Sequence, residues 1–244
     1  MAENFEWVKS TSVREHVFAE YRRIRDLMLA ERVEKARSDL FADFDMPRAA
    51  RAIGIDVSFD EKAGRPSIDL DNDQQLDILL DYAMMFDSKD ARPLRYEFIR
   101  RHERSEDEGL RAISKLYSDY SYAWLRPLRT KANFGVHCED LLSGREVFLV
   151  DRGLSQTLTK ESSHGLATGI HPFGDPALGC VMTGGAGLPF SLENAMAMLE
   201  EMLIDLKIEK RPPMSLDEKE TARFVAKFLH GAMRSGISDY VRYE

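Results

Sequence analysis

The chain has 244 residues, of which 43% are hydrophobic and 31% are charged, and its formal net charge at pH 7 is −8. This is the balance of a globular protein that buries a core, and it excludes a disordered chain. An acidic protein repels the phosphate backbone at long range, so nucleic-acid binding would require a local basic patch.

Two cysteines, Cys138 and Cys180, are too few for a disulfide framework and favour a reducing compartment. The first residues are acidic and lack the apolar stretch of a secretory signal. No uninterrupted apolar run approaches the ~20 residues that cross a bilayer. We therefore expect a cytoplasmic protein that does not engage a membrane.

Residues 1–117 are predicted to form a helical region. An apolar stripe beside many charges indicates one long helix from Val13 to about Ala42. Residues 55–71 contain Gly64, Pro66 and several acids, and they predict a loop or a short hairpin. The helices predicted for this region are 13–42, 47–54, 73–86, 92–102 and 106–117.

Four capping boxes mark helix starts. In each, a Ser or Asn is followed three residues later by Glu or Gln, so that two backbone N–H groups of the first turn find acceptors. The pairs are Ser12–Glu15, Asn72–Gln75, Ser105–Glu108 and Ser215–Glu218.

The period of the pattern changes after Tyr117, and residues 118–190 predict a central β-module of about five strands. Short antiparallel strands cannot all leave their edges exposed, so we expect a small barrel-like module. The predicted strands are 120–128, 132–139, 146–151, 165–172 and 178–183.

Residues 191–244 predict a C-terminal helical hairpin that packs on the rest of the chain. Ser191 is the expected cap of a helix over 192–207, and a second helix is expected over 216–235. Both carry one-sided apolar stripes, and Pro212-Pro213 stiffens the short connection. The predicted fold class is α+β, with an N-terminal helical region, a central antiparallel β-module and a C-terminal helical hairpin.

The stretch from Tyr96 to Phe190 resembles a set of uncharacterised bacterial proteins. The likeness rests on the turn Asp140-Leu141-Leu142-Ser143-Gly144, on the step from Val150 to Ser155, and on the strand and turn from Gly165 to Gly174. It implies a helical segment that leads into a small barrel-like module. It implies no activity and no site residues.

Histidines and cysteines gather in the β-module without the spacing of a metal site. Zinc favours Cys and His in tetrahedral sets, but no Cys-x-x-Cys or His-x-x-x-His pair occurs. A catalytic thiol would need a nearby imidazolium or a helix N-terminus, which the predicted strands do not supply. The residues concerned are His137, Cys138, His164, His171 and Cys180. We predict no catalytic residue and no metal ligand.

Three further patterns are incomplete. The glycines at 184–187 precede a helix but lack the lysine of a phosphate loop. The acids at 69–73 resemble the start of a calcium loop, but Gln74 and Leu80 stand at its glycine and glutamate positions. The stretch 48–55 resembles the start of a helix-turn-helix motif, but no partner helix follows it directly. We predict no cofactor.

The strand around Trp124 is the candidate binding surface. As a strand, Tyr120, Tyr122, Trp124 and Arg126 share one face, and Arg129 follows. Aromatic and basic side chains on a sheet bind single-stranded nucleic acid by stacking and phosphate contact. The alternative, which we favour, is that the aromatic rings fill the core of the module.

The leading hypothesis is therefore a non-enzymatic interaction or regulatory protein. Its partner would be a protein or a second copy of the chain. The alternatives are a nucleic-acid-associated protein that uses the Trp124 strand, which the net charge disfavours, and an enzyme whose site the sequence does not reveal. The salt dependence of binding separates the interaction protein from the nucleic-acid-associated protein, because phosphate binding releases counterions.

Overall fold

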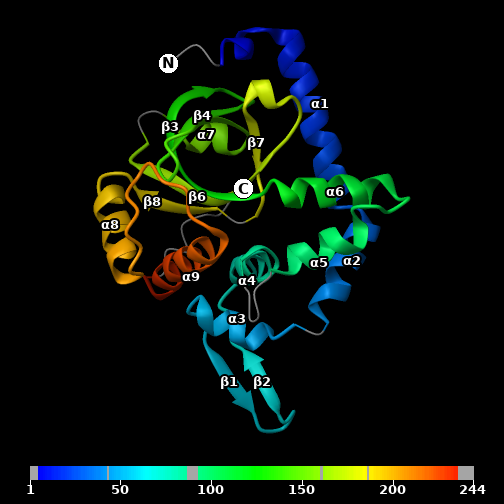
Figure 1. Ribbon diagram of the computed structural model, residues 1–244, viewed down its shortest axis with the longest axis vertical. Helices are drawn as coiled ribbons and strands as arrows, with labels where there is room; N and C mark the ends of the chain where they lie inside the picture. Colours follow the sequence, from blue (N-terminus) through cyan, green and yellow to red (C-terminus); the bar gives the residue numbers. More distant parts are fainter. Residues whose placement is uncertain (1–4, 43, 87–92, 160–161, 186, 236–244) are drawn as a thin grey trace.

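The computed structural model describes residues 5–42, 44–86, 93–159, 162–185 and 187–235. Figure 1 shows a β-barrel near one end of the long axis, helices around it and below it, and a small hairpin that projects at the opposite end. The fold class is α+β, as predicted, with helices before and after the β-structure. Within the described residues, no helix is long and apolar enough to cross a membrane.

The first long helix of the prediction is two helices. Helix α1 (Thr11–Met28) ends where Leu29 and Ala30 leave the helical path, and α2 (Glu31–Phe41) follows. The guanidinium of Arg37 donates to the free carbonyl of Met28 at 2.6 Å, which satisfies an end of α1. The prediction of one helix over 13–42 was therefore wrong. Neither glycine nor proline marks the break, so the sequence gives no local signal for it.

The other N-terminal elements lie close to their predicted ranges. They are α3 (Met46–Ala52), β1 (Val57–Asp60), β2 (Arg65–Ile68), α4 (Asp73–Met85), α5 (Leu94–His102) and α6 (Glu108–Ser118). Strands β1 and β2 pair as a hairpin, which is one of the two alternatives predicted for residues 55–71. Phe59 at its end is 64% exposed.

Of the four capping boxes, only the one at Asn72 caps its helix. Its side chain accepts from the N–H of Gln75 at 3.0 Å. At the other three starts a neighbour of the predicted residue is the cap: Ser10 for α1, Asp107 for α6, and Asp217 for α9 (Glu218–Ser235). Asp217 and Glu220 form a reciprocal box, each side chain accepting from the other's N–H at 2.8 Å.

Five strands close the barrel of the β-module. They are β3 (Ser121–Lys131), β4 (Gly135–Asp140), β5 (Glu146–Val150), β6 (His164–Pro172) and β7 (Cys180–Thr183). The order is β3-β4-β5-β7-β6, and β6 pairs back onto β3 to complete the ring. All the neighbours in this ring are antiparallel except β5 and β7, which are parallel. The barrel is therefore mixed, where the sequence predicted an antiparallel module.

The barrel interior is apolar and closed at one end. Inward side chains of the five strands form a cluster that includes Leu125, Val136 and Leu149. Leu154 and Leu158 belong to the same cluster, on and directly after the short helix α7 (Leu154–Thr157) between β5 and β6. Helix α7 and the residues after it therefore plug a closed, mixed five-stranded barrel. Because small barrels serve many functions, function has to be argued from the site.

A sixth strand and two helices complete the fold. Strand β8 (Leu188–Ser191) pairs with the start of β6, where Pro189 is tolerated because β8 is an edge strand. Helix α8 (Ala195–Asp205) begins three residues later than predicted, and its cap position is Asn194, not Ser191. Helix α9 contacts both α8 and α3, so the C-terminal helices lie against the rest of the chain.

At Trp124 the main core joins the β-module to the C-terminal helix α9. This side chain is fully buried, and its ring lies 4.8 Å from that of Phe190, 5.5 Å from that of Phe224 and 5.1 Å from that of Phe228. Helix α9 thus covers the outside of the barrel at β3.

Candidate functional site

The structure separates the five residues of the predicted binding surface. Trp124 is inaccessible in the core, and Arg126 is exposed on the barrel exterior, where it pairs with Glu139. Arg129 is also exposed, near the far end of β3. Tyr120 and Tyr122 remain together, each with its ring 5.4 Å from that of Phe86.

Tyr120 and Tyr122 line a cleft of about 720 Å³ between the start of β3 and the N-terminal end of α9. This size falls within the range of small-molecule sites, which are mostly apolar with a few convergent polar groups. The apolar lining comes from Met85, Phe86, Leu142, Pro213, Met214, Leu216 and Phe224. The polar lining includes two arginines, Arg95 and Arg145.

Arg95 forms one wall of the cleft. Its side chain is only 13% exposed, and its guanidinium carbon lies 4.9 Å from the ring centre of Tyr96 and 5.6 Å from that of Tyr120. Nη2 donates to Glu218 Oε1 at 3.1 Å, and Glu218 is 40% exposed. Nε is buried without an acceptor among the described residues. A mostly buried cation is therefore matched by one exposed carboxylate.

The turn from Asp140 to Ser143 also lines the cleft. One oxygen of the buried Asp140 accepts from the N–H groups of Trp124 and Leu142, at 3.0 and 3.1 Å, and the other oxygen is hydrogen-bonded to Ser143. The N–H of Met214 donates to Leu142 O at 2.7 Å, which fixes the segment before α9 to this turn. Both carboxylate oxygens of Asp140 are therefore hydrogen-bonded within the protein, and this carboxylate stabilises the turn.

Arg145 extends the polar part of the cleft. Its Nε donates to Ser143 Oγ at 3.2 Å, and its side chain is exposed. Both tyrosine hydroxyls are neutral at physiological pH, as an ordinary phenol is, and burial raises the pKa of Tyr120 and of Tyr122 further above the usual value. The cleft is therefore lined by two guanidinium groups, the carboxylates of Asp140 and Glu218, two tyrosine rings and apolar side chains.

Neither cysteine has the properties of a catalytic thiol. Both are buried and free, and burial raises the pKa of each to about 12. A thiol at that pKa stays protonated near neutral pH and is a poor nucleophile.

The histidines of the β-module are separated by the fold. His137 bonds Glu146 at 2.9 Å on the barrel exterior, and His164 bonds Ser163 at 3.0 Å. His171 is fully buried, and its Nδ1 donates to Leu116 O at 3.0 Å. Burial lowers the pKa of His171 to about 4, so it is neutral in the folded protein. Over the part of the chain that the structure describes, His, Cys, Asp and Glu form no cluster that could hold a metal ion.

Sequence reasoning missed Arg95. It lies in a basic helix with Arg100 and Arg101, and nothing in its sequence neighbourhood distinguishes it from them. Only the folded chain shows that Arg95 turns toward Tyr120, while Arg100 is 72% exposed and pairs with Glu97.

Comparison with known proteins adds no relative: no family model, curated protein or solved structure matches this chain.

Proposed function

We propose that this chain is a non-enzymatic binding protein whose cleft holds a small organic anion with an apolar body, as a regulatory protein would. The observation that carries the proposal is Arg95, a mostly buried guanidinium that lines a cleft of mixed polar and apolar character and faces one exposed carboxylate. A ligand carboxylate or sulfonate would replace Glu218 as its partner, and charge-assisted hydrogen bonds of this kind are among the strong ones.

The proposal that the protein is not an enzyme rests on the protonation and placement of its cysteines and of His171. The protonated thiols and the neutral, buried His171 are not arranged as a nucleophile with its base. A cytoplasmic location, and a protein partner or second copy that reads the ligand-bound state, complete the proposal.

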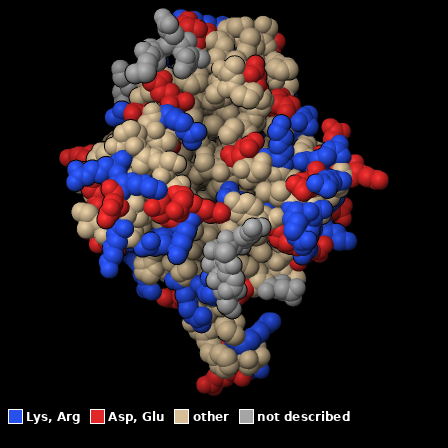
Figure 2. All heavy atoms as spheres, viewed as in Figure 1, with Lys and Arg blue, Asp and Glu red and all other residues tan. Residues whose placement is uncertain are grey.

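The nucleic-acid alternative receives less support. Trp124, the central ring of that hypothesis, is inaccessible, and Arg126 is paired with Glu139. Figure 2 shows acidic and basic side chains interspersed over the visible face, without the single-sign patch that a phosphate backbone favours.

The test uses two probes that differ in charge. Anilinonaphthalene sulfonate is an apolar aromatic anion, and N-phenylnaphthylamine is a similar molecule without the charge. We expect the folded protein to bind the anion, and Arg95→Gln to weaken that binding by about 10-fold or more, the loss of one hydrogen bond to a charged group. Binding of the neutral probe should change little.

Arg100→Gln is the matched control, because it removes an arginine of the same helix that is exposed and away from the cleft. Near-ultraviolet circular dichroism of each variant verifies the fold, since this dye also binds loosely packed proteins. Equal affinity of the anion for the wild type and Arg95→Gln would contradict the proposal.

A further inference from the structure

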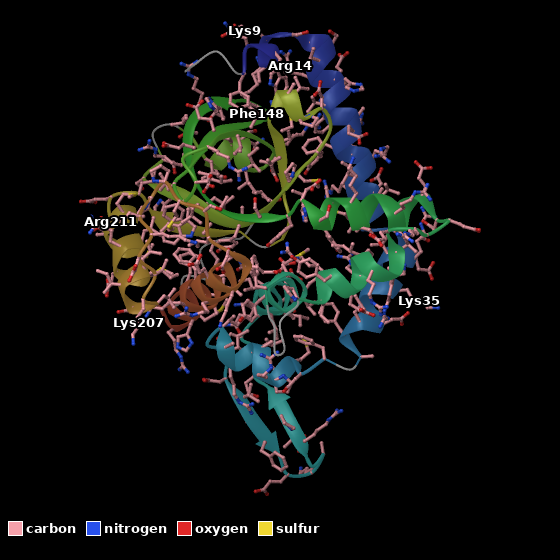
Figure 3. The ribbon with its side chains drawn as sticks, viewed as in Figure 1. Lys9, Arg14, Lys35, Phe148, Lys207 and Arg211 are labelled. Carbon is pink, nitrogen blue, oxygen red and sulfur yellow. The ribbon has the colours of Figure 1, made fainter. Side chains whose placement is uncertain are left out.

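A second cleft, of about 590 Å³, lies between the barrel and the helices α1 and α6. Its lining comes from both helices and from the strands β3, β5, β6 and β7. In Figure 3, the labelled Arg14 marks the start of α1, and the labelled Phe148 marks β5 in the barrel beside it. Like the first cleft, which Tyr120 and Tyr122 line, it has a volume within the range of small-molecule sites.

Apolar side chains make up most of the lining of the second cleft. Val147, Ile170 and Val181 come from three strands and belong to the apolar cluster of the barrel interior. Ile24 of α1 and Ile113 of α6 line the side that the helices form. An apolar group placed against such a surface is stabilised in proportion to the area removed from water. The second cleft therefore suits a hydrocarbon group.

The charged residues around the second cleft call for no charge on a ligand. Glu20 and Arg23 form an ion pair with each other at 2.8 Å on α1. Glu146 is hydrogen-bonded to a histidine of β4. Lys115 and Asp119 are exposed to solvent and opposite in sign. The polar rim is thus satisfied by the protein and by water, and the apolar part of the cleft remains for a ligand.

The two clefts adjoin at Ser121 and Arg145, which line both of them. Ser121 stands between Tyr120 and Tyr122, which line the first cleft, and its strand partner Ile170 lines the second. Arg145 directly precedes β5, whose first two residues line the second cleft. The clefts are therefore contiguous at the start of β3.

We propose that the two clefts together bind one amphipathic molecule, a single-chain anion whose head lies at Arg95 and whose hydrocarbon tail passes Ser121 into the second cleft. The position of the head rests on the function proposed above, and the position of the tail does not. The first cleft has a lining of mixed character and the second is mostly apolar, so polarity changes along them as it does along an alkanoate. The proposal thus names the ligand class as a long-chain organic acid.

The experiment measures how affinity depends on the length of the chain. The probes are the straight-chain alkanoates from hexanoate to dodecanoate, titrated calorimetrically into the full chain below the concentrations at which they form micelles. We expect the Kd to fall about threefold to fourfold for each added methylene, which is the effect of burying one CH₂ group. Arg95→Gln should weaken the binding of short and long alkanoates by the same factor, because it acts on the head alone.

Ala112→Phe tests the position of the tail. Ala112 is half-buried on α6 and lines only the second cleft, so a ring there narrows this cleft without removal of a core side chain. We expect the Kd of hexanoate to stay unchanged and that of dodecanoate to rise about 10-fold or more, as two methylenes lose their contacts. Ala197→Phe is the matched control, because it adds the same ring at an exposed position of α8 outside both clefts and should change neither Kd.

Each outcome separates the tail from the head. If Ala112→Phe loses its cooperative melt, Leu27→Trp narrows the same cleft from α1 and carries the test. A folded variant of this kind that binds dodecanoate as tightly as the wild type does would overturn the position of the tail and leave the anion site at Arg95 intact. Arg95→Gln that binds every alkanoate like the wild type, with the effect of Ala112→Phe retained, would refute the function proposed above and leave only the tail in place. Cosedimentation with vesicles of anionic phospholipid, without binding of free dodecanoate, would overturn the proposal in favour of a membrane surface.

Discussion

Replacement of Phe228 by alanine tests whether α9 is part of the core. Phe228 is 7% exposed, and its ring lies 5.1 Å from that of the fully buried Trp124. Truncation of a buried phenylalanine costs about 3–5 kcal/mol through lost apolar contact and a residual cavity. Loss of the aromatic pair contributes to that figure. For a chain of this size, each kcal/mol shifts the melting temperature by about 2–4 °C, so a decrease of about 10 °C is expected.

Calorimetry or circular dichroism of the purified variant measures this shift. Phe59→Ala is the control, because removal of a ring that is 64% exposed should change the free energy of unfolding by less than about 0.5 kcal/mol. If Phe228→Ala melts like the wild type while association with a partner or second copy weakens, α9 is a docking face and its assignment to the core is refuted.

Three other predictions concern glycines, thiols and pH. Gly169→Ala should destabilise the protein by about 1–3 kcal/mol, because a Cβ there would lie 2.0 Å from the Tyr120 hydroxyl. Gly231→Ala, in α9 with no atom within 4 Å of the new Cβ, should stabilise it by about 0.5–1 kcal/mol, and urea unfolding compares the two. Cys138 and Cys180 should react with a disulfide reagent only on unfolding, and fast labelling in native buffer would contradict their burial. The pKa of His171 is lowered to about 4, so its neutral form stabilises the fold above the unfolded-state pKa. This contribution, up to about 3 kcal/mol, is lost as pH falls from about 6.5 toward 4, and His171→Asn should show a shallower loss in pH-dependent melts.

The barrel strands could be predicted because alternation is a local signal. Val136 and Cys138 point inward while His137 and Glu139 point outward, and this pattern is visible in the sequence. The parallel pairing of β5 with β7 could not be predicted in the same way. It joins Phe148 to Cys180, which belong to strands that are not consecutive in the chain, and no local pattern specifies which distant strand becomes the neighbour.

The predicted helix starts were wrong where several neighbouring residues could serve as the cap. Ser10 and Ser12 stand two residues apart, and Ser105 and Asp107 do as well, so the spacing rule alone selected the wrong member of each pair. The break after Met28 left no signal because tertiary contacts, among them the bond from Arg37, stabilise it.

The candidate site was partly visible in the sequence. Tyr120 and Tyr122 were singled out for their aromatic character, and both line the cleft. Arg95 and Arg145 were not singled out, because their approach to these rings depends on how α5 and the turn at Asp140 are placed by the fold.

The most direct test of the proposed function is the affinity of Glu218→Gln for anilinonaphthalene sulfonate. Glu218 is the carboxylate that pairs with Arg95, so its neutralisation should free the guanidinium for the anion and strengthen binding severalfold. Damage to the cleft would weaken binding, so a gain separates an anion bound in the cleft from a disrupted cleft. Titration calorimetry of the wild type and Glu218→Gln should therefore give the lower Kd for the variant. An unchanged or higher Kd would contradict the claim that Arg95 is the anion-binding group of the cleft.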